Sequence, residues 1–370
     1  MKTTVIFGYS DVGKKLYEEL MVKERNIVFC DNKKEKQGKY GNIEVLSVEE
    51  AVKRYGNNNV EYIIASVYLY KEMIEQLRTL GINDEKIRTD LPEEASKASE
   101  EFYRKRSRTI RKKLVVEINI ARHCNLNCRS CDHFSPLSQE SFADLGEVER
   151  DFRRLLELFG NKGIEEIRIL GGEPLLNKQI NEYFYLLRNL FPEAKIFIIT
   201  NGILLVSMEN DFWDAAKRNN IIISVTKYPI KLDYDKLIEM AKIKDVEFEF
   251  FGNSSTGRTF WHTPLDFEGK QDPIYSFEHC RMSNWCIQLD RGKLYTCTLA
   301  ATIDIFNEYY GRRLELTDRD VIDIYAESSA DDILRKLAEP MSFCRYCGVR
   351  DRTYGHPWAI SMRDIKEWSY

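Results

Sequence analysis

Three cysteines stand close together in the middle of the chain. Cys124, Cys128 and Cys131 fall within eight residues, directly after an apolar segment typical of a β-strand. Thiolates are soft ligands that suit iron–sulfur clusters and zinc. A four-iron cluster normally takes four ligands, so three thiolates leave one iron open to another molecule. Zinc stays an alternative, with His123 or His133 as its fourth ligand.

A second motif follows the next apolar strand. Gly171, Gly172, Glu173 and Pro174 are consecutive there. Two adjacent glycines let the backbone approach a ligand closely. A glutamate carboxylate accepts hydrogen bonds, for example from an ammonium group. Alone, this tetrapeptide would be a turn; beside the cysteine motif it predicts a binding site.

Together the two motifs resemble the radical S-adenosyl-L-methionine (SAM) superfamily, over roughly residues 114–252. The resemblance implies a partial (βα) barrel that holds a 4Fe–4S cluster on the three cysteines and SAM on the open iron. Glu173, with the backbone of Gly171 and Gly172, would hold the methionine ammonium. One-electron reduction would then cleave SAM to a radical that takes a hydrogen atom from the substrate.

Other positions match this superfamily less closely. Ser224 and Thr226, on the fourth strand of the unit, fit a contact with the SAM ribose, although ordinary polar strand residues are an equal alternative. Asn201, after the third strand, is expected to face the same cavity. The superfamily usually carries an aromatic residue before its third cysteine, where this chain has Ser130. We therefore expect the adenine to pack elsewhere, with Phe134 as a candidate.

Residues 286–297 alternate apolar and polar positions around Asp-Arg-Gly, which predicts a β-hairpin. The cysteine spacing around it, over about residues 277–350, resembles the twitch extension of radical SAM enzymes, a shorter relative of the SPASM extension. That resemblance implies a second, auxiliary 4Fe–4S cluster. Its implied ligands are Cys280, Cys297, Cys344 and Cys347. A structural zinc on the same thiolates is the alternative.

One cysteine of this region is left over. Cys286 could replace Cys280 as a ligand, or it could be a buried core residue. A third interpretation makes it catalytic: in radical SAM epimerases, a cysteine thiol returns a hydrogen atom to the substrate radical from the opposite face.

Alternating strand and helix signals predict an α/β chain with parallel sheets. Strands are expected near 115–121, 166–170, 195–199, 221–226 and 246–251, with helices between them. In such βα units the chemistry lies at the C-terminal ends of the strands.

The first 95 residues alternate in the same way and weakly resemble truncated Rossmann-like domains of surface-sugar enzymes. Gly8, Ser10 and Gly13 lie between a strand and a helix, but Ser10 replaces the glycine that approaches a pyrophosphate. Asp31 ends the second strand, near the expected place for a ribose contact. Nucleotide-linked substrate binding and a purely structural role are equal alternatives, and NAD-dependent redox chemistry is not expected.

The expected organisation has four parts. These are a Rossmann-like domain (1–95), a charged linker (96–113), a radical SAM partial barrel (114–252), and a twitch domain with a C-terminal tail (253–370). Between Arg104 and Lys113 there are seven Lys or Arg residues. A solvated connecting helix explains them better than a patch for a phosphorylated substrate.

Composition limits the remaining possibilities. The 370 residues carry 55 Lys and Arg against 59 Asp and Glu, a net charge of −4, which does not suit a general nucleic-acid binder. No apolar run reaches the length of a membrane span, and the N-terminus lacks a signal-peptide pattern. We expect a cytoplasmic protein with no membrane partner.

The leading hypothesis is hydrogen abstraction from a hydroxyl-bearing carbon of a sugar or polyol that is nucleotide- or phosphate-linked. Return of hydrogen by a cysteine would give an epimer, which is slightly favoured, and loss of an electron and a proton would give a ketone. Maturation of a ribosomal peptide and a non-catalytic iron–sulfur or zinc protein are the other hypotheses. A reductant such as flavodoxin or ferredoxin is the expected protein partner.

Overall fold

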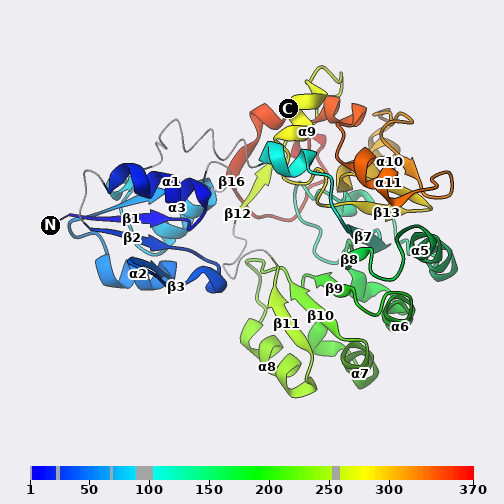
Figure 1. Cartoon of the computed structure of the whole chain (residues 1–370), viewed down its shortest axis with the longest axis horizontal. Coiled ribbons are helices and arrows are strands. Elements are labelled where there is room, and N and C mark those ends of the chain that lie inside the picture. The colour runs from blue at the N-terminus through cyan, green and yellow to red at the C-terminus, as the bar shows by residue number, and fades with distance from the viewer. Residues whose placement is uncertain (1, 22–25, 67–69, 89–102, 252–258) are drawn as a thin grey trace. The chain divides into compact units, whose positions relative to one another are not determined.

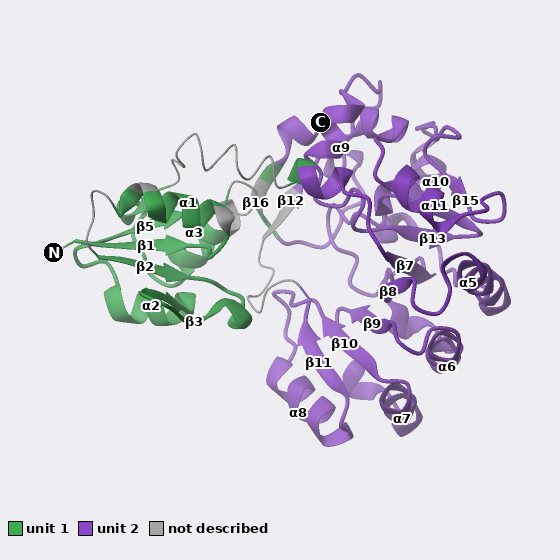
Figure 2. Cartoon of the chain, in the orientation of Figure 1, with its two compact units in different colours: residues 1–104, 253–261, 353–357 green, residues 105–252, 262–352, 358–370 purple. Residues whose placement is uncertain are grey.

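A computed structural model describes residues 2–21, 26–66, 70–88, 103–251 and 259–370. It divides into two compact units, which are described separately (Figures 1 and 2). Unit 1 comprises residues 1–104, 253–261 and 353–357, and unit 2 comprises the rest. Among the described residues, no helix is long and apolar enough to cross a membrane.

Unit 1 is built on a six-stranded sheet with the order β3-β4-β2-β1-β5-β6, parallel except for β3. Its sheet strands are β1 (Thr3–Phe7), β2 (Ile27–Cys30), β3 (Gly38–Tyr40), β4 (Ile43–Leu46), β5 (Val60–Ile64) and β6 (Ile87–Arg88). Its helices are α1 (Asp11–Leu20), α2 (Val48–Tyr55) and α3 (Tyr70–Thr79). Two apolar clusters form its core. The expected parallel sheet with a strand–helix start is confirmed.

Two short segments from the later part of the chain belong mostly to unit 1. Strands β12 (Thr259–His262) and β16 (Thr353–Pro357) pair with each other, and most of both belongs to unit 1. The sequence predicts both segments within the C-terminal domain, because pairing between distant segments leaves no local signal. The predicted linker, 96–113, lies partly outside the described residues, and its residues 103–108 are helical.

Unit 2 is built on an eight-stranded sheet with the order β11-β10-β9-β8-β7-β13-β14-β15. Its first five strands in the chain are parallel: β7 (Leu114–Ala121), β8 (Ile164–Gly171), β9 (Lys195–Thr200), β10 (Ile221–Val225) and β11 (Glu247–Phe250). Helices α5 (Leu145–Phe159), α6 (Ile180–Leu190), α7 (Asn210–Arg218) and α8 (Tyr234–Lys244) lie between or beside them. The predicted run of βα units is confirmed within a few residues at each end, as is the α/β class.

The predicted hairpin extends this sheet. Strands β13 (Gln288–Asp290) and β14 (Lys293–Tyr295) are antiparallel, and Gly292 in the turn has a φ of +72°. β13 pairs in parallel with β7, and β14 pairs with β15 (Ile322–Asp323). The helices of this part are α9 (Pro273–Glu278), α10 (Thr298–Tyr310) and α11 (Ala330–Leu337). Among the C-terminal cysteines, Cys297 stands between β14 and α10, whereas Cys344 lies in the 3-10 helix Ser342–Tyr346 and Cys347 follows that helix.

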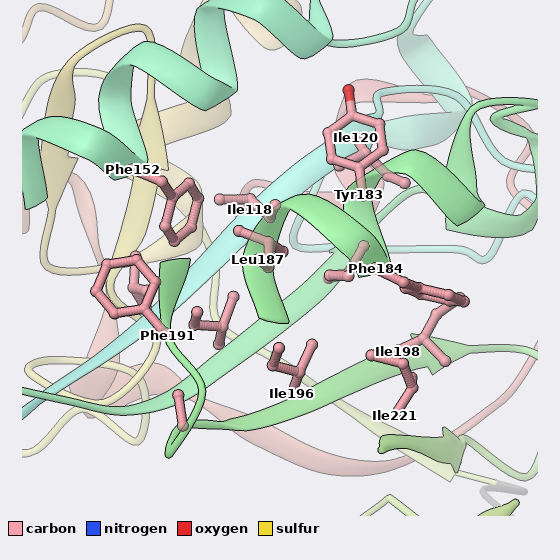
Figure 3. Packing of buried hydrophobic residues seen from close by; sticks show 14 of the residues in the cluster. Ile118, Ile120, Phe152, Tyr183, Phe184, Leu187, Phe191, Ile196, Ile198 and Ile221 are labelled. Carbon is pink, nitrogen blue, oxygen red and sulfur yellow. The ribbon is translucent and has the colours of Figure 1, made fainter. Parts of the chain in front are cut away.

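Alternation along the strands separates two faces of the sheet. Ile118 on β7 and Ile196 on β9 point into the core formed with the helices, where Phe152, Leu187 and Phe191 pack (Figure 3). The intervening residues occupy the opposite face, called the inner face here. It carries polar side chains, among them Glu117, Asn119, Arg168 and Ser224. These polar side chains stand on strands that the packed core holds in place, and they point away from that core.

Candidate functional site

The loop after β7 carries the first cysteine set. Cys124, Cys128 and Cys131 are half-buried free thiols that perturb one another electrostatically. Burial raises the pKa of Cys124 to about 11 and that of Cys131 to about 12. The backbone N–H of Leu126 donates to Cys124 Sγ at 3.4 Å, so the loop already folds around a sulfur. Three neighbouring thiols suit an iron–sulfur cluster with one open iron.

The glycine pair brings a second strand end against this loop. A Cβ at Gly172 would lie 2.0 Å from the His123 carbonyl oxygen, and one at Gly171 would lie 2.2 Å from the Ala121 carbonyl oxygen. The Gly172 N–H donates to Ala121 O at 2.7 Å, and the Glu173 N–H donates to His123 O at 3.0 Å. The close approach expected of these glycines is made to the cysteine loop itself, so the two motifs form one backbone unit.

Glu173 is fully buried within this unit. Its carboxylate accepts hydrogen bonds from the Thr200 hydroxyl at 2.6 Å, the Asn201 N–H at 3.0 Å and the Leu175 N–H at 3.1 Å. Burial raises its pKa to about 7, and these hydrogen bonds oppose the rise. Glu173 therefore joins the ends of β8 and β9, while Pro174 begins a buried turn of 3-10 helix.

The Asn201 side chain lies beside the cysteine loop: its amide donates to Asn125 Oδ1 at 2.8 Å and lies 3.8 Å from Cys124 Sγ. Ser224 on the inner face of β10 is buried and donates to Glu249 at 2.9 Å. Thr226 follows β10, and its N–H donates to the Thr200 carbonyl. The structure thus brings Asn201 to the first cysteine set.

Phe134 does not offer a surface for adenine. It is fully buried in the second core cluster, against Phe306 and Trp368. The sequence could not show this because both partners lie far along the chain.

The four thiols of the second set interact with one another. Burial raises the pKa of the Cys344 and Cys347 thiols well above its ordinary value, and the nearby thiols of Cys280 and Cys297 raise it further. Burial raises the pKa of Cys297 to about 12. Among the described residues, no three His, Cys, Asp or Glu side chains are spaced as ligands of a single metal ion. The donor set, four soft thiols, suits an iron–sulfur cluster.

The two cysteine sets approach each other at Asp132. This residue follows Cys131, and its carboxylate interacts electrostatically with Cys297 and Cys347. Burial raises its pKa to about 6, while Arg352 and Arg281 oppose that rise. One acidic side chain therefore lies within electrostatic range of both sets.

Cys286 has different surroundings from the four grouped thiols. It hydrogen bonds to Glu117 on the inner face of β7, and its further electrostatic neighbours include Arg168 and Cys280. Glu117 also accepts from Arg168 Nη1 at 2.9 Å and Gln288 Nε2 at 2.5 Å. Burial raises the pKa of Cys286 well above its ordinary value, so this sulfur stays a protonated thiol near neutral pH.

The C-terminal residues lie along the cysteine loop. Arg129 N–H donates to Ala359 O at 2.8 Å, and Ser361 N–H donates to the Asn127 carbonyl at 2.8 Å. The Trp358 indole N–H is directed at Cys128 Sγ, 3.3 Å away. No role for Trp358 could be predicted from the sequence, because the residue that it contacts, Cys128, lies 230 positions earlier in the chain.

In unit 1, the fingerprint residues hold the local fold. A Cβ at Gly13 would lie 2.1 Å from the Gly8 carbonyl oxygen, and Ser10 caps α1 by accepting from the Gly13 N–H at 3.3 Å. Asp31 is buried and accepts from the backbone N–H of Tyr9 at 2.8 Å. The residues that the sequence suggested for nucleotide recognition therefore make hydrogen bonds and close contacts within unit 1 itself.

Comparison with known proteins places the family match on the first site. Residues 118–249 match the radical SAM superfamily. Among curated proteins, the GTP 3′,8-cyclase of Helicobacter pylori is 30% identical over 100 residues, 27% of this chain and 31% of that protein. The GTP 3′,8-cyclase of Campylobacter jejuni is 31% identical over 137 residues, 37% of this chain and 40% of that protein. The chain therefore matches well under half the length of these relatives.

Two solved structures show lower similarity. BtrN in complex with AdoMet and 2-DOIA has a TM-score of 0.40 and 16% identity, covering 70% of this chain and 99% of that one. Native anSMEcpe with bound AdoMet has a TM-score of 0.29 and 20% identity, covering 37% of this chain and 43% of that one. At these TM-scores neither likeness adds to the assignment, which comes from the family match and the paired motifs. The chain therefore carries a radical SAM superfamily domain.

Proposed function

We propose that this radical SAM enzyme inverts a hydroxyl-bearing carbon of a sugar or polyol that is nucleotide- or phosphate-linked. One observation carries the proposal: Cys286 lies beside Glu117 at the inner face of the sheet, since the Glu117 N–H donates to the carbonyl of the next residue, Ile287, at 2.7 Å and the two side chains are hydrogen bonded. The four thiols proposed as auxiliary-cluster ligands, those of Cys280, Cys297, Cys344 and Cys347, would leave Cys286 over. A spare thiol beside a radical domain suits return of hydrogen to carbon.

The superfamily uses a 4Fe–4S cluster with SAM. The thiols of Cys124, Cys128 and Cys131 would hold this cluster, and Glu173 and Asn201 lie next to them. When bound, the pair supplies a carbon-centred radical that removes a hydrogen atom from the substrate. Gly171 and Gly172 fix the loop that presents the three sulfurs. Ser224 and Thr226 are proposed to contact the same cofactor.

The step assigned to Cys286 balances as follows. The S–H bond breaks, a C–H bond forms on the opposite face of the substrate carbon, and the unpaired electron moves to sulfur. One electron from a reductant such as flavodoxin or ferredoxin and one proton from solvent restore the thiol. Because that proton exchanges with water, the new hydrogen on carbon carries the isotope of the solvent.

Two-electron dehydrogenation of the same substrate class is the second candidate. The grouping of Cys280, Cys297, Cys344 and Cys347 favours it, because these four thiols would fully ligate an auxiliary cluster able to accept an electron. The substrate would then lose a second electron and a proton and become a ketone.

The curated relatives suggest a third candidate, a radical reaction on GTP. Their names state that they cyclise GTP, and their match falls short of half their length. This similarity supports a nucleotide or nucleotide-linked substrate more directly than it supports cyclisation.

The test is an anaerobic reaction in D₂O with reconstituted protein, SAM, a reductant, and a panel of nucleotide-linked sugars, polyols and GTP. Epimerisation predicts one carbon-bound deuterium in the product, read by mass spectrometry. Loss of a hydrogen pair without deuterium would overturn epimerisation in favour of dehydrogenation. Conversion of GTP alone would favour the reaction of the relatives.

A matched pair of variants assigns the donor. Cys286→Ala should still cleave SAM but should add no deuterium to the product. Cys30→Ala removes a fully buried cysteine of unit 1 and should leave labelling unchanged. Normal labelling by Cys286→Ala would remove Cys286 from the mechanism.

A further inference from the structure

Two side-chain donors converge on one sulfur of the first cysteine set. The Trp358 indole N–H lies 3.3 Å from Cys128 Sγ, and the Tyr228 hydroxyl hydrogen bonds to the same sulfur. The two rings contact each other, with centroids 6.1 Å apart at 53°. An N–H and an O–H group directed at a sulfur place partial positive charge beside it. Both donors therefore favour negative charge on this sulfur.

The neighbouring sulfurs receive different contacts. Cys124 Sγ accepts the backbone N–H of Leu126 at 3.4 Å and has the Asn201 amide at the longer distance of 3.8 Å. The backbone N–H groups of Ser135 and His133 donate hydrogen bonds to the sulfur of Cys131. Cys128 differs because two aromatic side chains from other parts of the chain donate to its sulfur, in addition to its own backbone N–H.

The position of Trp358 is fixed by the segment that carries it. Residues 359–361 pair with the cysteine loop through the Cys128–Ile360 bridge and two backbone hydrogen bonds of 2.8 Å. Further along, the Ser130 hydroxyl donates to the Glu367 carbonyl at 2.5 Å, and the Trp368 indole donates to the Cys131 carbonyl at 3.0 Å. The segment that follows Trp358 is therefore anchored to the cysteine loop at several points, which holds the indole at the sulfur.

We infer that Trp358 and Tyr228 are positioning residues that raise the reduction potential of the cluster proposed on Cys124, Cys128 and Cys131. Reduction adds negative charge to a cluster and its thiolates, so hydrogen bonds to a ligating sulfur stabilise the reduced form. This inference rests on the proposed cluster. It assigns a role to a C-terminal segment outside the family match, which ends at residue 249.

The test is a redox titration of reconstituted protein followed by electron paramagnetic resonance. The signal of this cluster is identified by its change on addition of SAM. Trp358→Phe keeps an aromatic ring against Tyr228 but removes the N–H, and Tyr228→Phe removes the hydroxyl alone. Each should shift the reduction equilibrium toward the oxidised form by about threefold to tenfold, where tenfold corresponds to about 59 mV for one electron.

Tyr183→Phe is the matched control, because its hydroxyl donates to the Ala143 carbonyl at 2.9 Å and not to a sulfur. Its midpoint should equal that of the wild type. Unchanged midpoints in Trp358→Phe and Tyr228→Phe, or an equal shift in Tyr183→Phe, would overturn the inference. If Trp358→Phe retains less iron than wild type, Tyr228→Phe decides alone by the same criterion. A wild-type protein without a SAM-responsive signal would instead refute the cluster assignment.

Discussion

The backbone N–H of Glu173 donates to the carbonyl oxygen of His123 across 3.0 Å. This bond joins the Gly-Gly-Glu-Pro segment to the cysteine loop, two motifs that lie about forty residues apart in the sequence. The carboxylate of the same glutamate accepts from Thr200 and Asn201 at the end of the next strand. The first cysteine set is thus supported by three consecutive strand ends before any cofactor binds.

Gly172 should tolerate no side chain. A Cβ there would overlap the His123 carbonyl oxygen at 2.0 Å, and backbone cannot move aside as a flexible side chain can. Gly172→Ala should lower the free energy of unfolding by more than about 2 kcal/mol and reduce the iron bound after reconstitution. Gly146→Ala in α5 is the control, since its nearest atom is a side-chain oxygen at 3.3 Å, and it should change stability by less than about 1 kcal/mol. Equal behaviour of the two variants would contradict this interpretation.

The buried pair of Arg168 and Glu117 should be costly to break. Their side chains are 7% and 4% exposed, and removing one partner leaves an uncompensated buried charge. Arg168→Leu should therefore lose about 3–5 kcal/mol in urea unfolding. Arg153→Leu breaks an exposed helical pair with Glu149 and should lose less than about 1 kcal/mol. A loss of less than about 1 kcal/mol in Arg168→Leu would show that the Arg168–Glu117 pair does not stabilise the fold.

The carboxyl of Glu173 should make stability depend on pH. Its pKa rises from 4.5 to about 7 on folding, mainly through burial. Between these values the folded protein holds a proton that the unfolded chain has released, so the contribution of this group to stability falls as pH rises through the window. Glu173→Gln cannot titrate at this position.

The measurement is a difference between two proteins without metal. The free energy of unfolding of wild type, minus that of Glu173→Gln, should fall by about 3 kcal/mol between pH 4.5 and 7. Taking the difference removes the contributions of other groups that titrate in the same range, such as Asp132 and His133. A constant difference across the window would exclude the raised pKa.

The sequence predicted the features that local pattern controls. Strand β1 and strand β2 lie where their apolar runs place them, and the five βα strands agree within a few residues. The cysteine and glycine motifs also fall at strand ends as expected, because parallel strands end at a common edge. Both are short-range patterns that burial and turn chemistry determine directly.

The contacts of Cys286 and Trp358 could not be predicted in that way. Glu117 was visible as the single charge of an apolar strand, and Arg168 as the single cation of the next, which was a usable signal for a buried pair. No local pattern, however, could link that pair to Cys286 or bring Trp358 to Cys128. These relationships depend on strand order and on a C-terminal segment that returns to the cysteine loop.

The most direct test of the account is formation of 5′-deoxyadenosine from SAM by reconstituted, chemically reduced protein, compared between Cys131→Ala and Cys344→Ala. Cys131 belongs to the set proposed to support SAM cleavage, and Cys344 belongs to the proposed auxiliary set. Wild type should form 5′-deoxyadenosine, Cys131→Ala should form none, and Cys344→Ala should retain the activity with about half of the wild-type iron. Abolition in Cys344→Ala with the first cluster intact, or activity in Cys131→Ala, would contradict that division.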